Sequence, residues 1–241
     1  MKNFELISFA SADELASRAA GAWLDEIEAA NRAGKMHCVA LSGGRIAPEF
    51  FTATVEQARV RKISFARVHF FWADERCVPP TDPESNFKLA SELLFAPLKI
   101  LANQIHRIRG EDSPQVAAKI AEKELGRIVS ADKSGQSVLD LIFLGMGEDG
   151  HVASLFPDAA AEILNCTVLY LAIENSPKPP PRRISLSYAA IAAARQVWVL
   201  VSGAGKEAAL RESLRPRGQT PLARVMQSCS RTKIFSDIRL D

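Results

Sequence analysis

Residues 137–151 read SVLDLIFLGMGEDGH, and this stretch joins a strongly apolar run to a loop that is rich in glycine and charge. The apolar part, 141–144, has no alternation of polar and apolar side chains. Such a run is typical of a strand that is buried on both faces, as in a parallel sheet covered by helices. The stretch therefore predicts an α/β fold.

The same order of strand, loop and helix recurs along the chain. Further apolar runs occupy 36–44, 68–74, 167–174 and 196–205. Ser11 and Glu14 predict a capping box at the start of a helix that runs towards Gly34. Other helices are predicted around 48–58, 86–94, 115–128 and 206–214. We expect one three-layer α/β domain over residues 1–241, with a mostly parallel central sheet flanked by helices.

The composition indicates a water-soluble globular protein, since 47% of the 241 residues are hydrophobic and 24% are charged. The net charge of +2 is too balanced to indicate nucleic acid or a membrane surface as the main partner. No apolar run reaches the ~18 residues of a membrane helix, and the first residues turn acidic before a signal-peptide core. We expect a cytoplasmic protein and, because no exposed apolar helix suggests an obligate partner, a monomer.

The cysteines and histidines carry no metal-binding or redox pattern. The four cysteines form no CxxC pair, and the four histidines lack the short spacing of a metal-binding helix. We therefore predict no metal site and reduced thiols.

Four loops share one position, because each follows the carboxyl end of a predicted strand: 42–44, 73–76, 145–151 and 202–206. Ligands of open α/β sheets bind at that edge. In Ser42-Gly43-Gly44 the glycines allow backbone N–H groups to approach a phosphate at a helix N-terminus, and Lys206 brings a cation to a second such turn. Alternatively, these turns only reverse the chain. The glycine spacing excludes a Walker P-loop.

The segment that follows the run 68–73 carries three consecutive charges, Asp74, Glu75 and Arg76. Arginine suits bidentate phosphate recognition, and Asp74 and Asn86 are further candidates for contact with a substrate. A structural ion pair that holds the loop is an equal alternative for Asp74 and for Glu75. We expect Ser85 to cap the next helix.

The loop 145–151 combines the residues of a general base. A histidine that titrates near pH 6.5 can take a proton from water, and a neighbouring carboxylate, Glu148 or Asp149, can orient it. Glycine N–H groups of the same loop are candidates for stabilising an oxyanion. The alternative is a capping turn in which Asp149 bonds the backbone and His151 is merely packed. From these residues alone, that alternative is favoured by about two to one.

Taken together, LSGG (41–44), ADERCVPPTDPESN (73–86) and above all LGMGEDGHVASLFP (144–157) resemble the 6-phosphogluconolactonases, within the superfamily that includes glucosamine-6-phosphate deaminase. The match follows nearly the whole chain in order. It implies a modified Rossmann-like fold and a small-molecule sugar phosphate as partner. It also implies hydrolysis of 6-phospho-D-glucono-1,5-lactone to 6-phosphogluconate in the oxidative pentose phosphate pathway, without a cofactor.

The resemblance also implies residue roles. His151 activates the attacking water, and Asp149 or Glu148 supports it. The residues expected around the phosphate are Ser42, Gly43, Gly44, Arg76, Lys206 and one of Arg182 and Arg183. The last two arginines lie in a Pro-rich loop that we expect to be rigid and near the site. One departure is Arg45-Ile46, where many relatives place Ser-Thr hydroxyls. Arg45 either supplies a cation instead or faces solvent.

Two other functions remain as alternatives. A glucosamine-6-phosphate deaminase-like isomerase typically carries Phe-Asn-Glu after the histidine, whereas residues 154–157 here are SLFP, without a carboxylate. A non-catalytic sugar-phosphate sensor usually needs a partner-reading domain, of which the sequence gives no sign, and His151 would be superfluous in it. A dinucleotide-dependent dehydrogenase is disfavoured because no GxGxxG follows the first strands.

Overall fold

The computed structural model describes residues 4–132, 135–229 and 231–240, so the predicted single domain over 1–241 includes a few residues outside these ranges. Six strands form a central sheet in the order β1-β9-β8-β5-β2-β3, and every pairing in it is parallel. The strands are β1 (Phe4–Ser8), β2 (His37–Leu41), β3 (Val68–Trp72), β5 (Leu141–Gly145), β8 (Val197–Val201) and β9 (Thr232–Ser236). The predicted α/β fold with a mostly parallel sheet is confirmed.

A second, antiparallel sheet stands beside the first and has the order β4-β7-β6. Its strands are β4 (Asp74–Arg76), β6 (Tyr170–Ile173) and β7 (Arg183–Leu186). The apolar run 167–174 was predicted as a strand of the parallel type, and this is wrong, because its strand β6 pairs antiparallel with β7. An apolar run indicates that a strand is buried on both faces, and β6 is indeed buried beneath α5. Such a run does not indicate the direction of the neighbouring strand.

The five predicted helices are present, and the described residues form four further short helices that were not predicted. The helices are α1 (Ala12–Arg32), α2 (Ala47–Arg61), α3 (Asn86–Ala90), α4 (Ala96–Leu98), α5 (Pro114–Ile128), α6 (Ala161–Leu164), α7 (Tyr188–Ala193), α8 (Glu207–Ser213) and α9 (Pro221–Ser228). A π-helical turn, η1 (Ser91–Phe95), joins α3 to α4, and η2 (Ala102–Gln104) is a 3₁₀ turn. None of the helices within the described ranges combines the length and the apolar composition that a bilayer crossing requires.

The start of α1 shows how the sequence sets a helix boundary. The Ser11 hydroxyl accepts a hydrogen bond from the Glu14 backbone N–H at 3.2 Å, and the Glu14 carboxylate accepts one from Ala10 N at 3.0 Å. Ser11 is therefore confirmed as the helix cap, whereas the carboxylate of the predicted capping box reaches the N–H of Ala10, one residue before the cap, and not that of Ser11.

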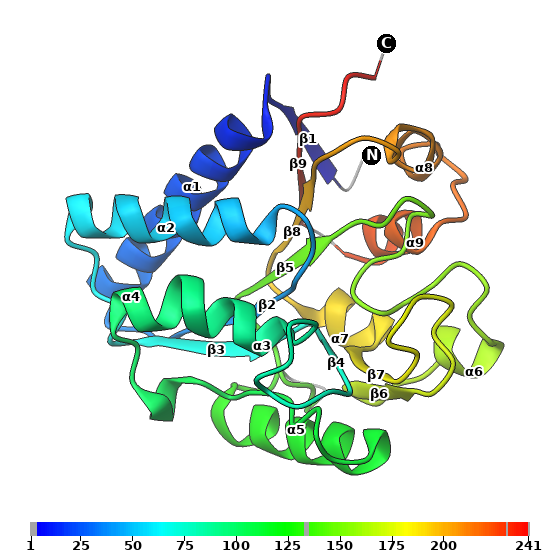
Figure 1. Cartoon of the computed structure of the whole chain (residues 1–241), viewed down its shortest axis with the longest axis horizontal. Coiled ribbons are helices and arrows are strands. Elements are labelled where there is room, and N and C mark those ends of the chain that lie inside the picture. Colours follow the sequence, from blue (N-terminus) through cyan, green and yellow to red (C-terminus); the bar gives the residue numbers. More distant parts are fainter. Residues whose placement is uncertain (1–3, 133–134, 230, 241) are drawn as a thin grey trace.

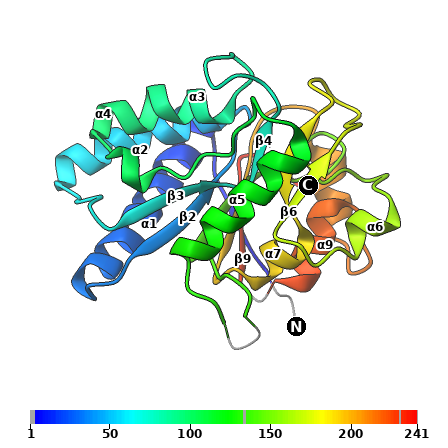
Figure 2. The same ribbon diagram turned by 90° about the horizontal axis from the view of Figure 1, so that it is seen from below.

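Helices cover both faces of the central sheet (Figure 1). The pair α1 and α2 lies along one face, and α7 and α9 lie on the other, where the small sheet and α5 extend the layer (Figure 2). Trp23 of α1 is fully buried and packs on Phe50 of α2 and Phe143 of β5, with ring centroids 5.7 and 5.1 Å away. These aromatic contacts fix the helix layer against the sheet.

Candidate active site

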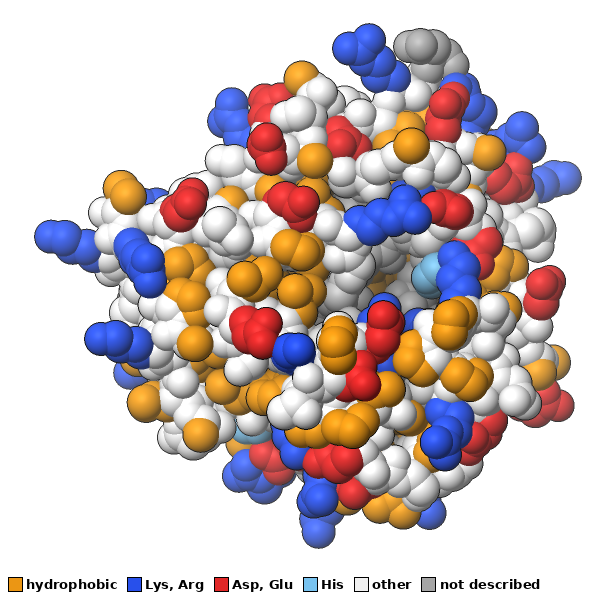
Figure 3. Space-filling model, in the orientation of Figure 1, with side chains coloured by type: hydrophobic (Ala, Val, Ile, Leu, Met, Phe, Trp, Pro, Cys, Tyr) orange, Lys and Arg blue, Asp and Glu red, His pale blue; other side chains and the backbone are white. Residues whose placement is uncertain are grey.

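A cleft of about 220 Å³ opens at the carboxyl ends of β2, β5 and β8, where the four predicted loops meet. Figure 3 shows the hollow in this face, with basic, acidic and histidine side chains around it. Most of the predicted site residues line the cleft: Ser42, Gly43, Gly44, Arg45, Asp74, Arg76, Asn86, Glu148, His151, Arg183 and Lys206. The convergence follows from topology, because carboxyl ends of parallel strands share one edge of a sheet.

His151 forms a pair with Asp149. The Nδ1 atom of His151 lies 2.5 Å from Oδ1 of Asp149, which also accepts the His151 backbone N–H at 3.3 Å. The imidazole packs on the Phe156 ring, with centroids 4.6 Å apart. A Cβ at Gly147 would overlap both the imidazole and the Asp149 carboxylate, so only glycine fits there. The turn therefore orients the histidine through a carboxylate, a ring and a close backbone approach.

The turn uses some of its own N–H groups. Gly147 N donates to the carbonyl of His151 at 2.9 Å, and Gly150 N donates to the carbonyl of Gly147 at 3.1 Å. The prediction that glycine N–H groups of this loop stabilise an oxyanion therefore does not fit these two glycines, because their hydrogen bonds close the turn itself.

Burial and charge set the protonation of the pair. Burial lowers the pKa of His151 below its ordinary value, and the hydrogen bond to Asp149 opposes this only in part. Burial alone would raise the pKa of Asp149, but the contact with His151 outweighs it and the pKa lies below its ordinary value. At neutral pH the pair is a neutral imidazole beside a carboxylate.

Glu148 and Arg45 meet across the mouth of the cleft. Nη2 of Arg45 lies 2.7 Å from Oε1 of Glu148, and both side chains are well exposed. The two acids of this loop are thereby separated: Asp149 holds His151, and Glu148 pairs with the arginine. Lys206 lies near them with 6% of its surface exposed, and burial lowers its pKa, as does the charge of Arg45.

Asp74 is a hydrogen-bonded centre that links several loops. Its carboxylate accepts the Ser42 hydroxyl at 2.9 Å and the Ser154 hydroxyl at 2.8 Å, and the Asn86 amide donates to its backbone carbonyl at 2.9 Å. Among the described residues its partners are hydroxyl and amide groups, so the alternative of a structural ion pair is wrong for Asp74. A Cβ at Gly43 would overlap the Asn86 amide, so this glycine allows the two loops to approach.

Glu75 is buried and holds the start of α3. One of its carboxylate oxygens accepts the N–H groups of Arg76 and Asn86, and the other accepts Phe87 N and the Ser85 hydroxyl. Burial raises the pKa of Glu75 to about 7, although the three N–H groups lower it. Ser85 accepts Lys88 N at 3.2 Å, which confirms it as the helix cap. Glu75 thus fixes the backbone beneath Arg76 and Asn86.

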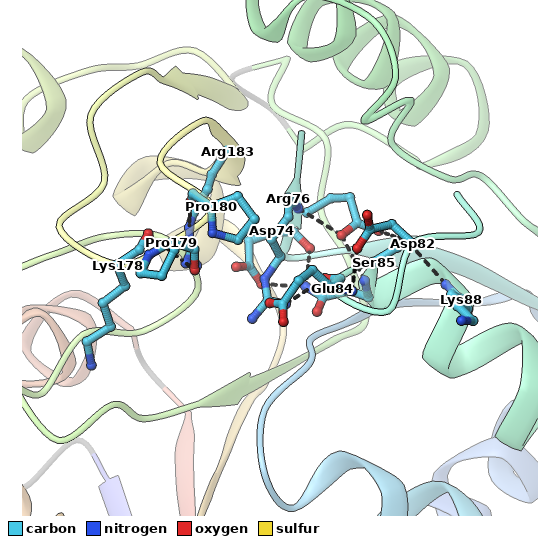
Figure 4. A network of polar contacts seen from close by, with 12 residues as sticks. Asp74, Arg76, Asp82, Glu84, Ser85, Lys88, Lys178, Pro179, Pro180 and Arg183 are labelled. Atoms are coloured by element: carbon cyan, nitrogen blue, oxygen red, sulfur yellow. Dashed lines mark hydrogen bonds and ion pairs between the residues drawn. The ribbon is translucent and has the colours of Figure 1, made fainter. Parts of the chain in front are cut away.

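The Pro-rich loop borders the cleft as expected, but its two arginines differ. Arg183 is 4% exposed, and its guanidinium donates to the carbonyls of Lys178, Pro179 and Pro180 at 3.2, 2.9 and 3.0 Å. Arg182 is exposed and lies outside the lining of the cleft. Arg76, from β4, donates to the Glu84 carbonyl at 2.6 Å (Figure 4).

Lys178 lines the cleft and was missed by the sequence reasoning. Its ammonium lies 3.8 Å from Oδ1 of Asp149. The basic character of the Pro-rich loop indicates a cation near the site, but the loop carries Lys178, Arg182 and Arg183, and its sequence does not distinguish among them. Among residues 4–132, 135–229 and 231–240, no group of three or more potential metal ligands is found.

Comparison with known proteins places these residues in a family. Residues 10–234 match the family described as glucosamine-6-phosphate isomerases/6-phosphogluconolactonase. A 6-phosphogluconolactonase of Mycobacterium tuberculosis is 40% identical over 153 residues, which cover 62% of this chain and 62% of that protein. One of Haemophilus influenzae is 38% identical over 175 residues, or 72% of each chain. The structure of 6-phosphogluconolactonase from Trypanosoma brucei has a TM-score of 0.83 and 25% identity, covering 96% of this chain and 95% of that one.

Proposed function

Because the chain belongs to the glucosamine-6-phosphate isomerase/6-phosphogluconolactonase family, we propose that it hydrolyses 6-phospho-D-glucono-1,5-lactone to 6-phosphogluconate in the oxidative pentose phosphate pathway. The observation that carries the proposal is that His151, paired with Asp149, lines a cleft that also holds a glycine turn and Lys206. We further propose that the enzyme acts in the cytoplasm as a monomer and needs no cofactor.

The phosphate binds at the end of the cleft formed by Ser42, Gly43 and Gly44. This turn directly precedes α2, whose N-terminus favours an anion. Lys206 lines the same cleft and is buried, and a phosphate dianion that binds beside it compensates the cost of burying its positive charge. Arg45 lies at the mouth of the cleft and adds a second cation there. It thus supplies a positive charge to the phosphate where many relatives place a hydroxyl group.

His151 acts as the general base. With Nδ1–H donated to the Asp149 carboxylate, the lone pair of Nε2 is left for water. The attacking oxygen bonds to C1 as its proton passes to Nε2, and the C1–ring oxygen bond then breaks as the same proton returns to the ring oxygen. Asp149 stabilises the imidazolium that exists between these steps.

The isomerase alternative needs an additional acid after the histidine. In the Phe-Asn-Glu stretch of deaminases the glutamate stands third, and the third residue of the corresponding stretch here is Phe156. Its ring packs on the imidazole of His151, and it has no proton to give. Ser154, the first residue of the stretch, donates its hydroxyl to Asp74. These contacts support the lactonase over the isomerase.

The test is proton release from freshly generated 6-phosphogluconolactone, with spontaneous hydrolysis subtracted. We expect the wild-type protein to accelerate hydrolysis and His151→Ala to lose about 10²- to 10⁴-fold in rate, the usual contribution of a general base. His69→Ala removes a histidine outside the cleft and should retain the rate. No acceleration by the wild type would refute the function, and full activity of His151→Ala would refute the role of the base.

A further inference from the structure

Lys178 is the cation of the cleft that lies beside the catalytic pair. Of the basic side chains that line the cleft, Arg45 is paired with Glu148, and Arg76 donates to the carbonyl of Glu84. Lys206 is buried, which lowers its pKa, and the charges of Arg45 and Lys178 both lower that pKa further. The Lys178 ammonium, by contrast, lies 3.8 Å from Oδ1 of Asp149, which is longer than a hydrogen bond. Within residues 4–132, 135–229 and 231–240 the ammonium donates no hydrogen bond, so its N–H groups are available to a ligand.

The loop that carries Lys178 is held from beneath by Arg183. The buried guanidinium binds three consecutive carbonyls, those of Lys178, Pro179 and Pro180. Ser176 also holds this backbone, since its hydroxyl donates a hydrogen bond to the Lys178 carbonyl at 3.0 Å and accepts one from the Lys178 backbone N–H at 3.2 Å. Figure 4 shows the lysine side chain extending away from this anchored backbone. The backbone from which the lysine side chain extends is thus held in place by the side chains of Arg183 and Ser176.

Arg183 also connects this backbone to the histidine. Its guanidinium carbon lies 5.7 Å from the centroid of the Phe156 ring, and that ring packs on the imidazole of His151. One buried cation therefore orients both the lysine loop and the ring that supports the base.

We propose that Lys178 is a further catalytic residue, whose ammonium faces the carbonyl oxygen of the bound lactone and stabilises the oxyanion at C1, and that Arg183 is the positioning residue that holds it there. The inference rests on the proposed lactonase function. Its chemical reason is the location of the base: His151 delivers water to C1, and Lys178 lines the same cleft with its ammonium 3.8 Å from the Asp149 carboxylate of that pair, within reach of the substituents of C1.

The step balances without a proton from the lysine. As the water oxygen bonds to C1 and its proton moves to His151, the carbonyl π pair moves to the carbonyl oxygen, and the Lys178 ammonium donates a hydrogen bond to that oxyanion. The pair returns to re-form the C=O bond as the C1–ring oxygen bond breaks, and the ring oxygen takes the proton from His151. Two glycine amides of the turn, Gly147 and Gly150, are already bonded within it, so the lysine supplies what they cannot.

The charge of Lys178 also acts on His151. Burial is the main cause that lowers the pKa of His151, and the Lys178 cation lowers it further, whereas Asp149 and Asp74 raise it. Removal of the lysine should therefore raise the pKa of His151, a change that loss of a merely structural side chain would not produce.

The experiment compares wild type, Lys178→Ala, Lys178→Arg and Arg182→Ala. Arg182→Ala is the matched control, because it removes an exposed charge from the same loop outside the cleft. Steady-state kinetics on the lactone give kcat and KM, and inhibition by inorganic phosphate reports on the phosphate end. NMR titration of the imidazole gives the pKa of His151 without any turnover.

We expect Lys178→Ala to lose about 10²-fold in kcat, as when one oxyanion donor is removed, with KM and phosphate inhibition near wild type. Lys178→Arg should recover part of the rate, and the pKa of His151 should rise in Lys178→Ala but not in Arg182→Ala. An unchanged kcat in Lys178→Ala would overturn the proposal, as would a loss confined to KM and phosphate inhibition. If the wild type fails to hydrolyse the lactone, the proposed function fails, whereas an unshifted pKa of His151 in Lys178→Ala would refute the placement of the lysine itself.

Discussion

Two histidine–carboxylate pairs of this molecule look alike in isolation. Nδ1 of His151 lies 2.5 Å from Asp149, and Nδ1 of His106 lies 2.8 Å from Glu124. Burial is the first cause that lowers the pKa of each histidine, and the partner carboxylate opposes it in each case. Neither the contact nor the direction of the pKa shift distinguishes a base from a structural residue.

The second ring nitrogen makes the difference. Nε2 of His106 lies 2.9 Å from Nδ1 of His69, and the His106 ring stacks on Phe71 with centroids 4.6 Å apart. Both nitrogens of His106 are therefore engaged, and its side chain is 4% exposed. His151 opens instead onto the cleft. A perturbed pKa thus points to function only where one nitrogen can reach a ligand.

The largest expected effect comes from neutralising one carboxylate of each pair. Asp149→Asn keeps the shape but loses the charge that holds Nδ1–H and stabilises the imidazolium, so kcat on the lactone should fall by about 10²-fold or more. Glu124→Gln makes the same change at the other pair and should leave kcat unchanged. Equal kcat values for the two variants would show that the second ring nitrogen does not distinguish the two pairs in catalysis.

A smaller effect should appear in stability, in the opposite order. His106→Ala removes two hydrogen bonds and a stacked ring from a buried position, so we expect the free energy of unfolding to fall by about 1–3 kcal/mol in urea denaturation. The folded variant should keep its kcat. If kcat falls by more than the fraction of unfolded protein accounts for, His106 has a role in the reaction.

The sequence predicted the edge of the sheet at which the site lies, because apolar runs followed by glycine and charge mark the carboxyl ends of buried strands. It did not predict which acid serves the histidine. Glu148 and Asp149 are adjacent in the chain, and only the three-dimensional course of the turn directs one to His151 and the other to Arg45.

Lys178 was missed for a related reason. Its place beside Asp149 depends on the contacts of Arg183 with three loop carbonyls, and no local pattern of sequence encodes them. The small antiparallel sheet escaped prediction because β4 has only three residues and pairs with a strand more than 100 positions away. Long-range pairing of this kind is set by tertiary packing and not by local preference.

The smallest expected effect is the pH dependence that the two histidines share. Each has a pKa in the folded state below its ordinary value of 6.5, so the unfolded chain binds the proton more readily. The stability that each contributes is therefore present above pH 6.5 and is lost as the pH falls through the folded-state pKa, by at most about 1.4 kcal/mol per pH unit for each group. His106→Asn and His151→Asn should each flatten the fall in unfolding free energy between pH 7.5 and 5.5, measured by urea denaturation. Of these two histidines only His151 should contribute to the acidic limb of kcat/KM, and its contribution should lie below pH 6.5, because the free enzyme keeps a neutral imidazole to lower pH than a free histidine does. If His106→Asn shifts the acidic limb of kcat/KM while Glu124→Gln does not, His106 affects the reaction. The difference between a bonded and an open ring nitrogen would then not be enough to separate a structural histidine from a catalytic one.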